Sequence, residues 1–188
     1  MSRIVAGIAG GRRIAAPRGF SGRPTSERAR EGMFATLGSL LGDLAGLRFA
    51  DLYAGTGAVG LEALSRGAAH ALFVESDRSA ARAIDAGARS LRLPGAAVLA
   101  SPVERLAAMP PPDGEPYDVV FLDPPYALAD ASLARVLADL RAGGWFAPEA
   151  VAVVERSSRD QPFPWPEGFA AERERRYGDA TLWYGQAH

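Results

Sequence analysis

The chain has 188 residues, of which 48% are hydrophobic and 23% are charged, and its formal net charge at pH 7 is −1. This length suits one domain with a short extension, and the composition is that of a folded chain rather than a disordered one. No window approaches the roughly 18 apolar residues of a membrane span, and the first residues lack the apolar core of a signal peptide, so we expect a cytoplasmic protein. The absence of cysteine and the presence of only two histidines argue against disulfides and metal sites.

The basic residues are unevenly distributed along the chain. All 21 of them are arginines, and residues 1–30 hold seven arginines against one acidic residue, whereas the rest of the chain is net acidic. A single strongly basic end indicates a localised contact with a polyanion. A solvated and partly flexible terminus explains the same charges equally well, so the composition alone leaves both interpretations open.

Residues 1–45 predict a β-hairpin followed by a helix. Two short apolar-leaning runs, 3–9 and 12–15, flank Gly10-Gly11, a dipeptide that tolerates the positive φ angles of a tight turn. Thr25 or Ser26 can cap a helix whose apolar residues then recur at helical spacing. We therefore expect a basic extension over residues 1–45 and the main domain over residues 46–188.

From residue 47 onward, short apolar runs alternate with helical stretches. The expected strands cover residues 48–53, 71–75, 97–100, 119–122 and 151–155, and the expected helices cover residues 57–65, 78–91, 103–108 and 131–141. Such alternation predicts an α/β fold with a parallel sheet covered on both faces. The last two strands, 169–177 and 180–184, predict an antiparallel hairpin at the sheet edge. This combination favours the Rossmann-like class I methyltransferase fold over that of a dehydrogenase.

A glycine-rich segment, Asp51-Leu-Tyr-Ala-Gly-Thr-Gly-Ala-Val-Gly60, follows the first of these strands and opens a helix. Gly55 and Gly57 let the backbone turn sharply toward a ligand, and Gly60 lets the helix lie close to the sheet. The helix N-terminus favours a polar or anionic group. The pattern therefore predicts a nucleotide-type cofactor, although glycines at such positions also occur in turns that bind nothing.

Two acidic residues help to identify the cofactor, and one of them, Asp51, favours S-adenosylmethionine over a dinucleotide. Asp51, at the strand end, would repel a pyrophosphate but could face the ammonium of a methionine moiety. Glu75, at the end of the next strand, is placed to accept hydrogen bonds from ribose hydroxyls, which both cofactors possess.

The sequence Asp123-Pro124-Pro125-Tyr126 follows a buried strand and is the candidate catalytic segment. An exocyclic amino nitrogen on a base is a poor nucleophile because its lone pair is delocalised into the ring. Asp123 and the carbonyl of Pro124 could accept its hydrogens and aim the lone pair at a sulfonium methyl. The prolines stiffen the turn, and Tyr126 offers a ring on which an extruded base can stack. We therefore predict an S-adenosylmethionine-dependent enzyme that methylates the amino group of a nucleic-acid base.

The chain resembles a known family, the bacterial methyltransferases that modify guanine N2 in 16S ribosomal RNA. The resemblance runs nearly end to end and rests on segments 23–31 (RPTSERARE), 51–67 (DLYAGTGAVGLEALSRG), 73–77 (FVESD), 123–126 (DPPY) and 176–184 (RYGDATLWY). The DPPY turn is shared by many amino-directed methyltransferases, whereas the first and last segments narrow the family. The resemblance implies a monomeric-type enzyme without a metal that recognises 16S ribosomal RNA within an assembling small ribosomal subunit.

The resemblance and the residue pattern together give the expected site. The expected cofactor-binding residues are Thr25, Asp51, Tyr53, Ala54, Gly55, Gly57, Glu75, Ser76 and Ser101. The expected RNA-binding residues are Arg3, Arg12, Arg13, Arg23, Arg28 and Arg30. The chain departs from the family at two positions. Gly87 or a neighbour stands where an asparagine is usual, and Ser101 stands near the usual adenine-binding aspartate.

Three other functions stay open on the sequence. An amino-directed methyltransferase could act on another RNA base or on adenine N6 in DNA, although the chain shows no separate target-recognition domain. A nicotinamide-dependent dehydrogenase would explain the glycine loop but not the DPPY turn. An RNA-binding assembly factor without catalysis would use the same fold but would not need the Asp123 carboxylate.

Overall fold

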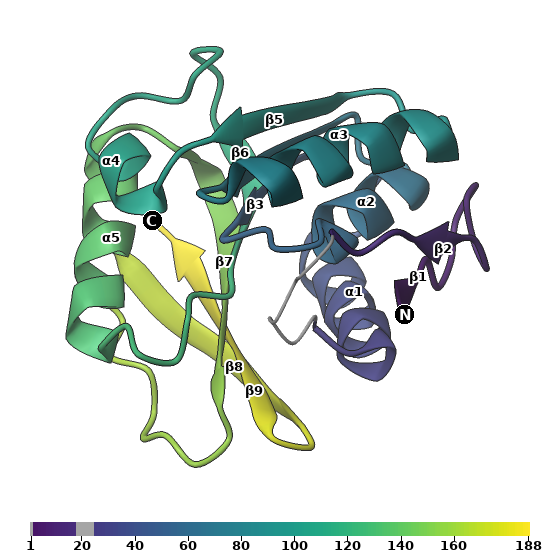
Figure 1. Ribbon diagram of the computed structural model, residues 1–188. Coiled ribbons are helices and arrows are strands. Elements are labelled where there is room, and N and C mark those ends of the chain that lie inside the picture. The colour runs from purple at the N-terminus through teal and green to yellow at the C-terminus, as the bar shows by residue number, and fades with distance from the viewer. Residues whose placement is uncertain (1, 18–24) are drawn as a thin grey trace. The chain divides into compact units, whose positions relative to one another are not determined.

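The computed structural model describes residues 2–17 and 25–188 (Figure 1). The chain divides into two compact units, Met1–Ser101 and Pro102–His188. The described residues before position 45 and the strands between residues 48 and 100 belong to the first unit, and the domain boundary expected after residue 45 stays a prediction.

The first unit begins with a small hairpin and a helix. Strands β1 (Ser2–Arg3) and β2 (Arg13–Ile14) pair antiparallel, as the sequence predicts. Helix α1 (Glu27–Leu41) begins after Ser26, whose side chain accepts a 3.1 Å hydrogen bond from the N–H of Ala29. That contact satisfies one of the unpaired amides of the first helical turn and explains why the helix starts there.

The rest of the first unit consists of three strands alternating with two helices. These elements are β3 (Arg48–Leu52), α2 (Ala58–Ser65), β4 (His70–Glu75), α3 (Arg78–Leu91) and β5 (Ala96–Ala100). The strands are parallel in the order β5-β4-β3. Helix α2 packs against β3 and β4 and helix α3 against β4 and β5, and the apolar residues of β3 and β4 are buried, whereas those of β5 are half-buried or exposed.

The second unit combines a parallel pair of strands with an antiparallel hairpin. Its elements are α4 (Val103–Ala107), β6 (Tyr117–Leu122), α5 (Asp130–Ala142), β7 (Phe146–Ser157), β8 (Phe169–Tyr177) and β9 (Ala180–Ala187). The strand order is β6-β7-β9-β8, in which β6 and β7 are parallel and β9 is antiparallel to both of its neighbours. Helices α4 and α5 pack against each other (Figure 1).

The α/β fold with parallel strands and a closing antiparallel hairpin is confirmed. Several elements extend past their expected bounds: β9 ends at Ala187 rather than at residue 184, and β7 begins at Phe146 rather than near residue 151. Pro148 and the exposed Glu149 interrupt the apolar run in the sequence, and the backbone is irregular at this point, where Glu149 adopts a left-handed φ of 62°.

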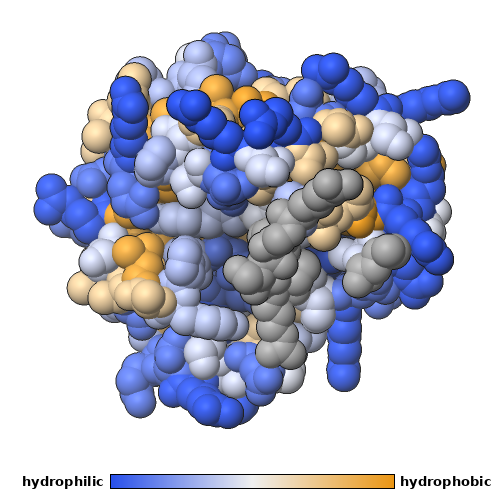
Figure 2. Space-filling view, viewed as in Figure 1, coloured by the Kyte–Doolittle hydropathy of each residue, from blue (hydrophilic) through white to orange (hydrophobic). Residues whose placement is uncertain are grey.

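Hydrophilic side chains cover most of the face seen in Figure 2, with smaller hydrophobic areas between them. None of the helices in the described ranges combines the length and apolar character needed to cross a membrane.

Candidate active site

The loop after β3 has an unusual backbone. Tyr53, Gly55 and Gly57 have φ angles of 59°, 55° and 72°. The left-handed conformation is easy for glycine but costs a residue such as tyrosine roughly 1–2 kcal/mol. Hydrogen bonds from the N–H of Ala54 to the carbonyl of Val74 (3.0 Å) and from the N–H of Gly57 to the carbonyl of Ala54 (2.7 Å) hold the loop in this shape. A strained residue held this firmly at a strand end is typical of a binding loop.

Two glycines of this segment are required by close packing. A Cβ on Gly57 would lie 2.9 Å from Cγ1 of Ile84 on α3, and a Cβ on Gly60 would collide with the ring of Phe73 on β4. The expectation that Gly60 lets α2 lie close to the sheet is therefore confirmed.

Asp51 is buried at the end of β3, with 1% of its surface exposed. Its Oδ2 atom accepts a 2.8 Å hydrogen bond from the N–H of Gly60 in the first turn of α2. The N-cap residue of α2, Gly57, has no side chain that could cap the helix, so Asp51 takes that task from the neighbouring strand. Burial raises the pKa of Asp51 to about 8, opposed by the Gly60 hydrogen bond and assisted by the negative charge of Glu75.

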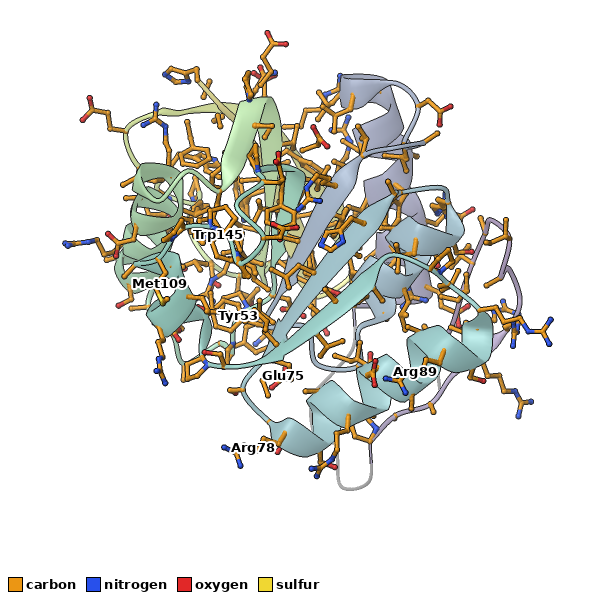
Figure 3. The ribbon with its side chains drawn as sticks, turned by 90° about the horizontal axis from the view of Figure 1, so that it is seen from above. Tyr53, Glu75, Arg78, Arg89, Met109 and Trp145 are labelled. Carbon is orange, nitrogen blue, oxygen red and sulfur yellow. The ribbon has the colours of Figure 1, made fainter. Side chains whose placement is uncertain are left out.

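Glu75 joins the loop to the end of β4. Its Oε2 accepts a 2.8 Å hydrogen bond from the N–H of Gly55, and its Oε1 accepts one of 2.8 Å from the N–H of Asp77 and one of 3.3 Å from the hydroxyl of Ser76. A carboxylate offers about four acceptor positions, so these three contacts leave capacity for a ligand hydroxyl. Figure 3 shows Tyr53 and Glu75 near the ends of their strands, with Arg78 at the start of α3.

The first unit brings most of the expected cofactor residues together. Ser101 joins the group because its N–H donates a 3.0 Å hydrogen bond to the carbonyl of Glu75. Thr25 is buried, and its carbonyl accepts a hydrogen bond from Arg30. The glycine cradle, the spare acceptor capacity of Glu75 and the hydroxyl of Ser101 fit an adenosine-type ligand. Within the described ranges, no three His, Cys, Asp or Glu side chains are grouped so that they could hold a metal ion.

The DPPY segment lies in the second unit, directly after β6. Leu122 is fully buried, Asp123 is half-buried, Pro124 is buried, and Tyr126 is 59% exposed. The Tyr126 ring therefore presents much of its apolar surface to solvent. The N–H of Leu128 donates a 2.9 Å hydrogen bond to the carbonyl of Pro125, which closes the turn.

Comparison with known proteins identifies the family. A family model described as "Conserved hypothetical protein 95" matches residues 2–186. The chain belongs to this family. Two curated relatives, both named "Ribosomal RNA small subunit methyltransferase D", are 34% identical over 95% of this chain and 86% of the relative (Escherichia coli) and 32% identical over 94% and 89% (Haemophilus influenzae). The resemblance stated from the sequence is confirmed.

Solved structures agree with this assignment. The Escherichia coli protein yhhF has a TM-score of 0.84 and 31% identity over 100% of this chain and 98% of its own. Magnesium protoporphyrin IX methyltransferase from Synechocystis, solved with bound SAM, is 13% identical with a TM-score of 0.64 over 91% and 89%, so it shares the fold alone. The fold is therefore the Rossmann-like methyltransferase fold.

The arginines expected to bind RNA fall into different environments. Arg13 and Arg28 are exposed, and Arg3 is exposed in an ion pair with Glu27 (2.9 Å). Arg12 donates to the carbonyls of Leu91 (3.0 Å) and Ser90 (2.6 Å) at the end of α3, where a cation complements the helix dipole. Arg23 lies outside the described residues.

Arg30 differs from the other arginines because it is fully buried. Its guanidinium donates to the carbonyls of Thr25 (2.9 Å) and Arg3 and to the hydroxyl of Ser2 (3.0 Å). Burial lowers the pKa of Arg30, while the nearby Glu62 carboxylate raises it. Side-chain contact with RNA would require these contacts to break, so the structure gives Arg30 a structural task.

Glu62 was not expected to matter from its sequence position. It is fully buried in α2, and its carboxylate accepts hydrogen bonds from the N–H groups of Val5 (2.7 Å) and Ala6 (3.0 Å) and from Nε of Arg66 (2.8 Å). Nε of Arg30 lies 3.9 Å away. The sequence contained a signal for this role: Glu62 is the one charged residue in the apolar stretch 58–65, and a buried glutamate needs partners.

Proposed function

We propose that this protein transfers a methyl group from S-adenosylmethionine to the exocyclic N2 of a guanine in 16S ribosomal RNA. Its substrate would be an assembling small ribosomal subunit in the cytoplasm, and the enzyme would act as a monomer. The proposal is supported by the names of the curated relatives and by the residues of the two candidate segments.

The observation that carries the proposal is the exposed Tyr126 three residues after Asp123 at the end of a buried strand. An extruded base would stack on the Tyr126 ring, while its amino group would donate hydrogen bonds to the Asp123 carboxylate and the Pro124 carbonyl. These acceptors would concentrate the lone pair on the amino nitrogen and fix its direction. They would also stabilise the positive charge that develops on that nitrogen before it loses a proton.

The cofactor would be held by residues of the first unit. The Glu75 carboxylate would accept hydrogen bonds from the ribose hydroxyls, and Ser101 would contact the adenine end. The backbone of Tyr53, Ala54, Gly55 and Gly57 would lie against the methionine part, and Ser76 and Thr25 would border the site. S-adenosylmethionine supplies an electrophilic methyl group on a sulfonium. Asp51, whose carboxylate is already bound to Gly60, would act mainly by fixing the loop.

RNA affinity would come from the exposed arginines of the basic extension. Arg13 and Arg28 are exposed, and Arg3 keeps most of its side chain in solvent despite its ion pair. Arg12 could add a contact only by leaving the α3 carbonyls. Phosphate contacts of this kind position an RNA without reading its bases, and they weaken as the salt concentration rises.

Methyl transfer from labelled S-adenosylmethionine to small subunits that lack the modification, followed by nucleoside analysis, tests the proposal. Labelled N2-methylguanosine in 16S RNA is the expected product, and the Asp123→Ala variant is the matched control. Label on another RNA base, or on adenine in a DNA substrate, would show that guanine N2 is the wrong target. Binding of NAD in preference to S-adenosylhomocysteine would contradict the cofactor assignment. Full complementation by Asp123→Ala in cells would favour a non-catalytic assembly role.

A further inference from the structure

A buried arginine holds the segment that follows the DPPY turn. Arg156 lies in β7 and has only 4% of its surface exposed. Its Nη2 donates a 2.7 Å hydrogen bond to the carbonyl of Leu128, and its Nε forms a 2.7 Å ion pair with Oδ1 of Asp130. Asp160 adds a weaker attraction at 3.9 Å. One guanidinium therefore fixes two points of the chain that are close together in the sequence.

Leu128 and Asp130 directly follow the exposed part of the turn, residues 125–127. The N–H of Leu128 donates to the carbonyl of Pro125, so the contacts run without a break from Arg156 to the residue before Tyr126. Residues 125–127 are exposed. The first residue of α5 is Asp130, and its N-cap residue, Ala129, has no side chain that could cap the helix. Without Arg156, Asp130 at the start of α5 would lose its charged partner. The carbonyl of Leu128, two residues after Tyr126, would lose its buried donor.

We propose that Arg156 is the positioning residue of the base-binding turn. It holds residues 125–130 in the shape that presents the Tyr126 ring to the extruded base. This inference rests on the proposed function. An exposed aromatic ring on a loose segment would have to be ordered each time a base binds, whereas a segment fixed beforehand avoids that entropy loss. The guanidinium suits this task because its Nη2 holds the Leu128 carbonyl by a hydrogen bond while its charge attracts the Asp130 carboxylate.

Conservative variants test the inference, because removing a buried guanidinium outright endangers folding. Arg156→Lys keeps the charge but offers only a point contact, and Asp130→Asn keeps the Leu128 contact while removing the ion pair. The control is Arg135→Ala, which removes a 3.1 Å ion pair with Asp139 on the exposed side of the same helix. For Arg156→Lys we expect kcat/KM for RNA to fall by about 10-fold or more, as misplacement of a reacting group does. For Asp130→Asn we expect a smaller fall, while the KM for S-adenosylmethionine stays within about 2-fold.

Amide hydrogen exchange of peptides covering residues 124–130 gives a readout that needs no activity. Faster exchange in Arg156→Lys and Asp130→Asn, with wild-type exchange in Arg135→Ala, is the expected result. Unchanged exchange would show that Arg156 does not order this segment. Faster exchange with wild-type turnover would show that Arg156 stabilises the segment but does not position it for catalysis. If wild-type protein fails to methylate RNA, the proposed function fails, while the exchange experiment still decides whether Arg156 orders this segment.

Discussion

The carboxylate of Asp51 accepts a hydrogen bond from the backbone N–H of Gly60, at 2.8 Å, across the glycine loop. This contact closes the loop between β3 and α2 and caps the helix from a residue nine positions earlier. Because the carboxylate is almost completely buried, it favours the protonated form, and its pKa lies at about 8. The residue that closes the glycine loop after β3 is thus sensitive to pH.

Replacing Asp51 by asparagine should flatten the dependence of stability on pH. The pKa of this carboxyl is about 8 in the folded chain and 3.8 in its ordinary state, so folding takes up a proton between these values. Its contribution to stability is full below about pH 4 and is lost as the pH rises to about 8. The amide of the variant would not titrate, and its oxygen would still accept from Gly60. Urea unfolding measures the free energy of unfolding of both proteins. The value for Asp51→Asn minus that for wild type should rise by more than about 1 kcal/mol between about pH 5 and pH 8. If variant and wild type differed in unfolding free energy by the same amount at both pH values, the raised pKa of Asp51 would be wrong.

Replacing Asp123 by alanine should abolish methyl transfer and leave cofactor affinity unchanged. Of the two substrates, the carboxylate is expected to contact the base and not the cofactor, so the loss should appear in kcat. We expect a fall of about 100-fold or more, the usual cost of removing a group that stabilises the charge of the transition state. Titration with S-adenosylhomocysteine measures binding separately. Wild-type turnover in this variant would refute the amino-positioning mechanism.

The ring of Tyr126, rather than its hydroxyl, should be what catalysis needs. Tyr126→Phe keeps the stacking surface and should retain most of the activity, whereas Tyr126→Ala removes a contact worth about 1–3 kcal/mol per stacked base. Steady-state kinetics on small subunits would compare the two. If phenylalanine proves as damaging as alanine, the hydroxyl matters and stacking is the wrong explanation.

Single replacements of Arg12 and Arg13 should separate a phosphate contact from a structural one. Arg13 is exposed, so its loss should reduce the slope of log affinity against log salt by about 0.7–1. Arg12 is held by the carbonyls at the end of α3, so Arg12→Ala should leave the slope closer to wild type. Filter binding of RNA across a salt series provides the slopes, and identical slopes for both variants would remove the distinction.

Replacing Arg30 should destabilise the first unit rather than weaken RNA binding selectively. Its removal leaves the carbonyls of Arg3 and Thr25 without their donor and removes a positive charge beside Glu62. Breaking a buried charge pair costs about 3–5 kcal/mol. Arg89→Ala, which breaks an exposed 2.8 Å pair with Asp85, serves as the control and should cost less than about 1 kcal/mol in thermal or urea unfolding.

The elements were predictable where one physical signal dominated. Helix α3 and strand β8 have the bounds expected from the sequence, because α3 has Asp77 as a cap and a clear apolar face, and β8 ends at a Gly-Asp turn. The glycine loop after β3 was also predictable, because Gly57 and Gly60 stand at the expected spacing and a side chain at either position would collide with Ile84 or Phe73.

The environments of charged side chains were much less predictable. Arg13 and Arg30 look alike in the sequence, yet one is exposed and the other is buried among backbone carbonyls. Arg156 follows an apolar run and resembles any strand-end charge, although it binds Leu128 and Asp130, which lie far earlier in the chain. Such partners come from distant parts of the chain, so they cannot be predicted from the local spacing of residues.

Main-chain N–H groups of residues 5–9, between β1 and β2, attach this segment to α2. The N–H groups of Val5 and Ala6 bind Glu62, and those of Ile8 and Ala9 bind the carbonyl and hydroxyl of Ser65. A Cβ on Gly7 would collide with the carbonyl of Ser65, so this glycine is a position where the attachment dictates the residue. Because these contacts use backbone atoms of residues 5–9, an exposed side chain such as that of Arg13 could be replaced without losing them, whereas replacing Arg12 would also remove its contacts with the end of α3.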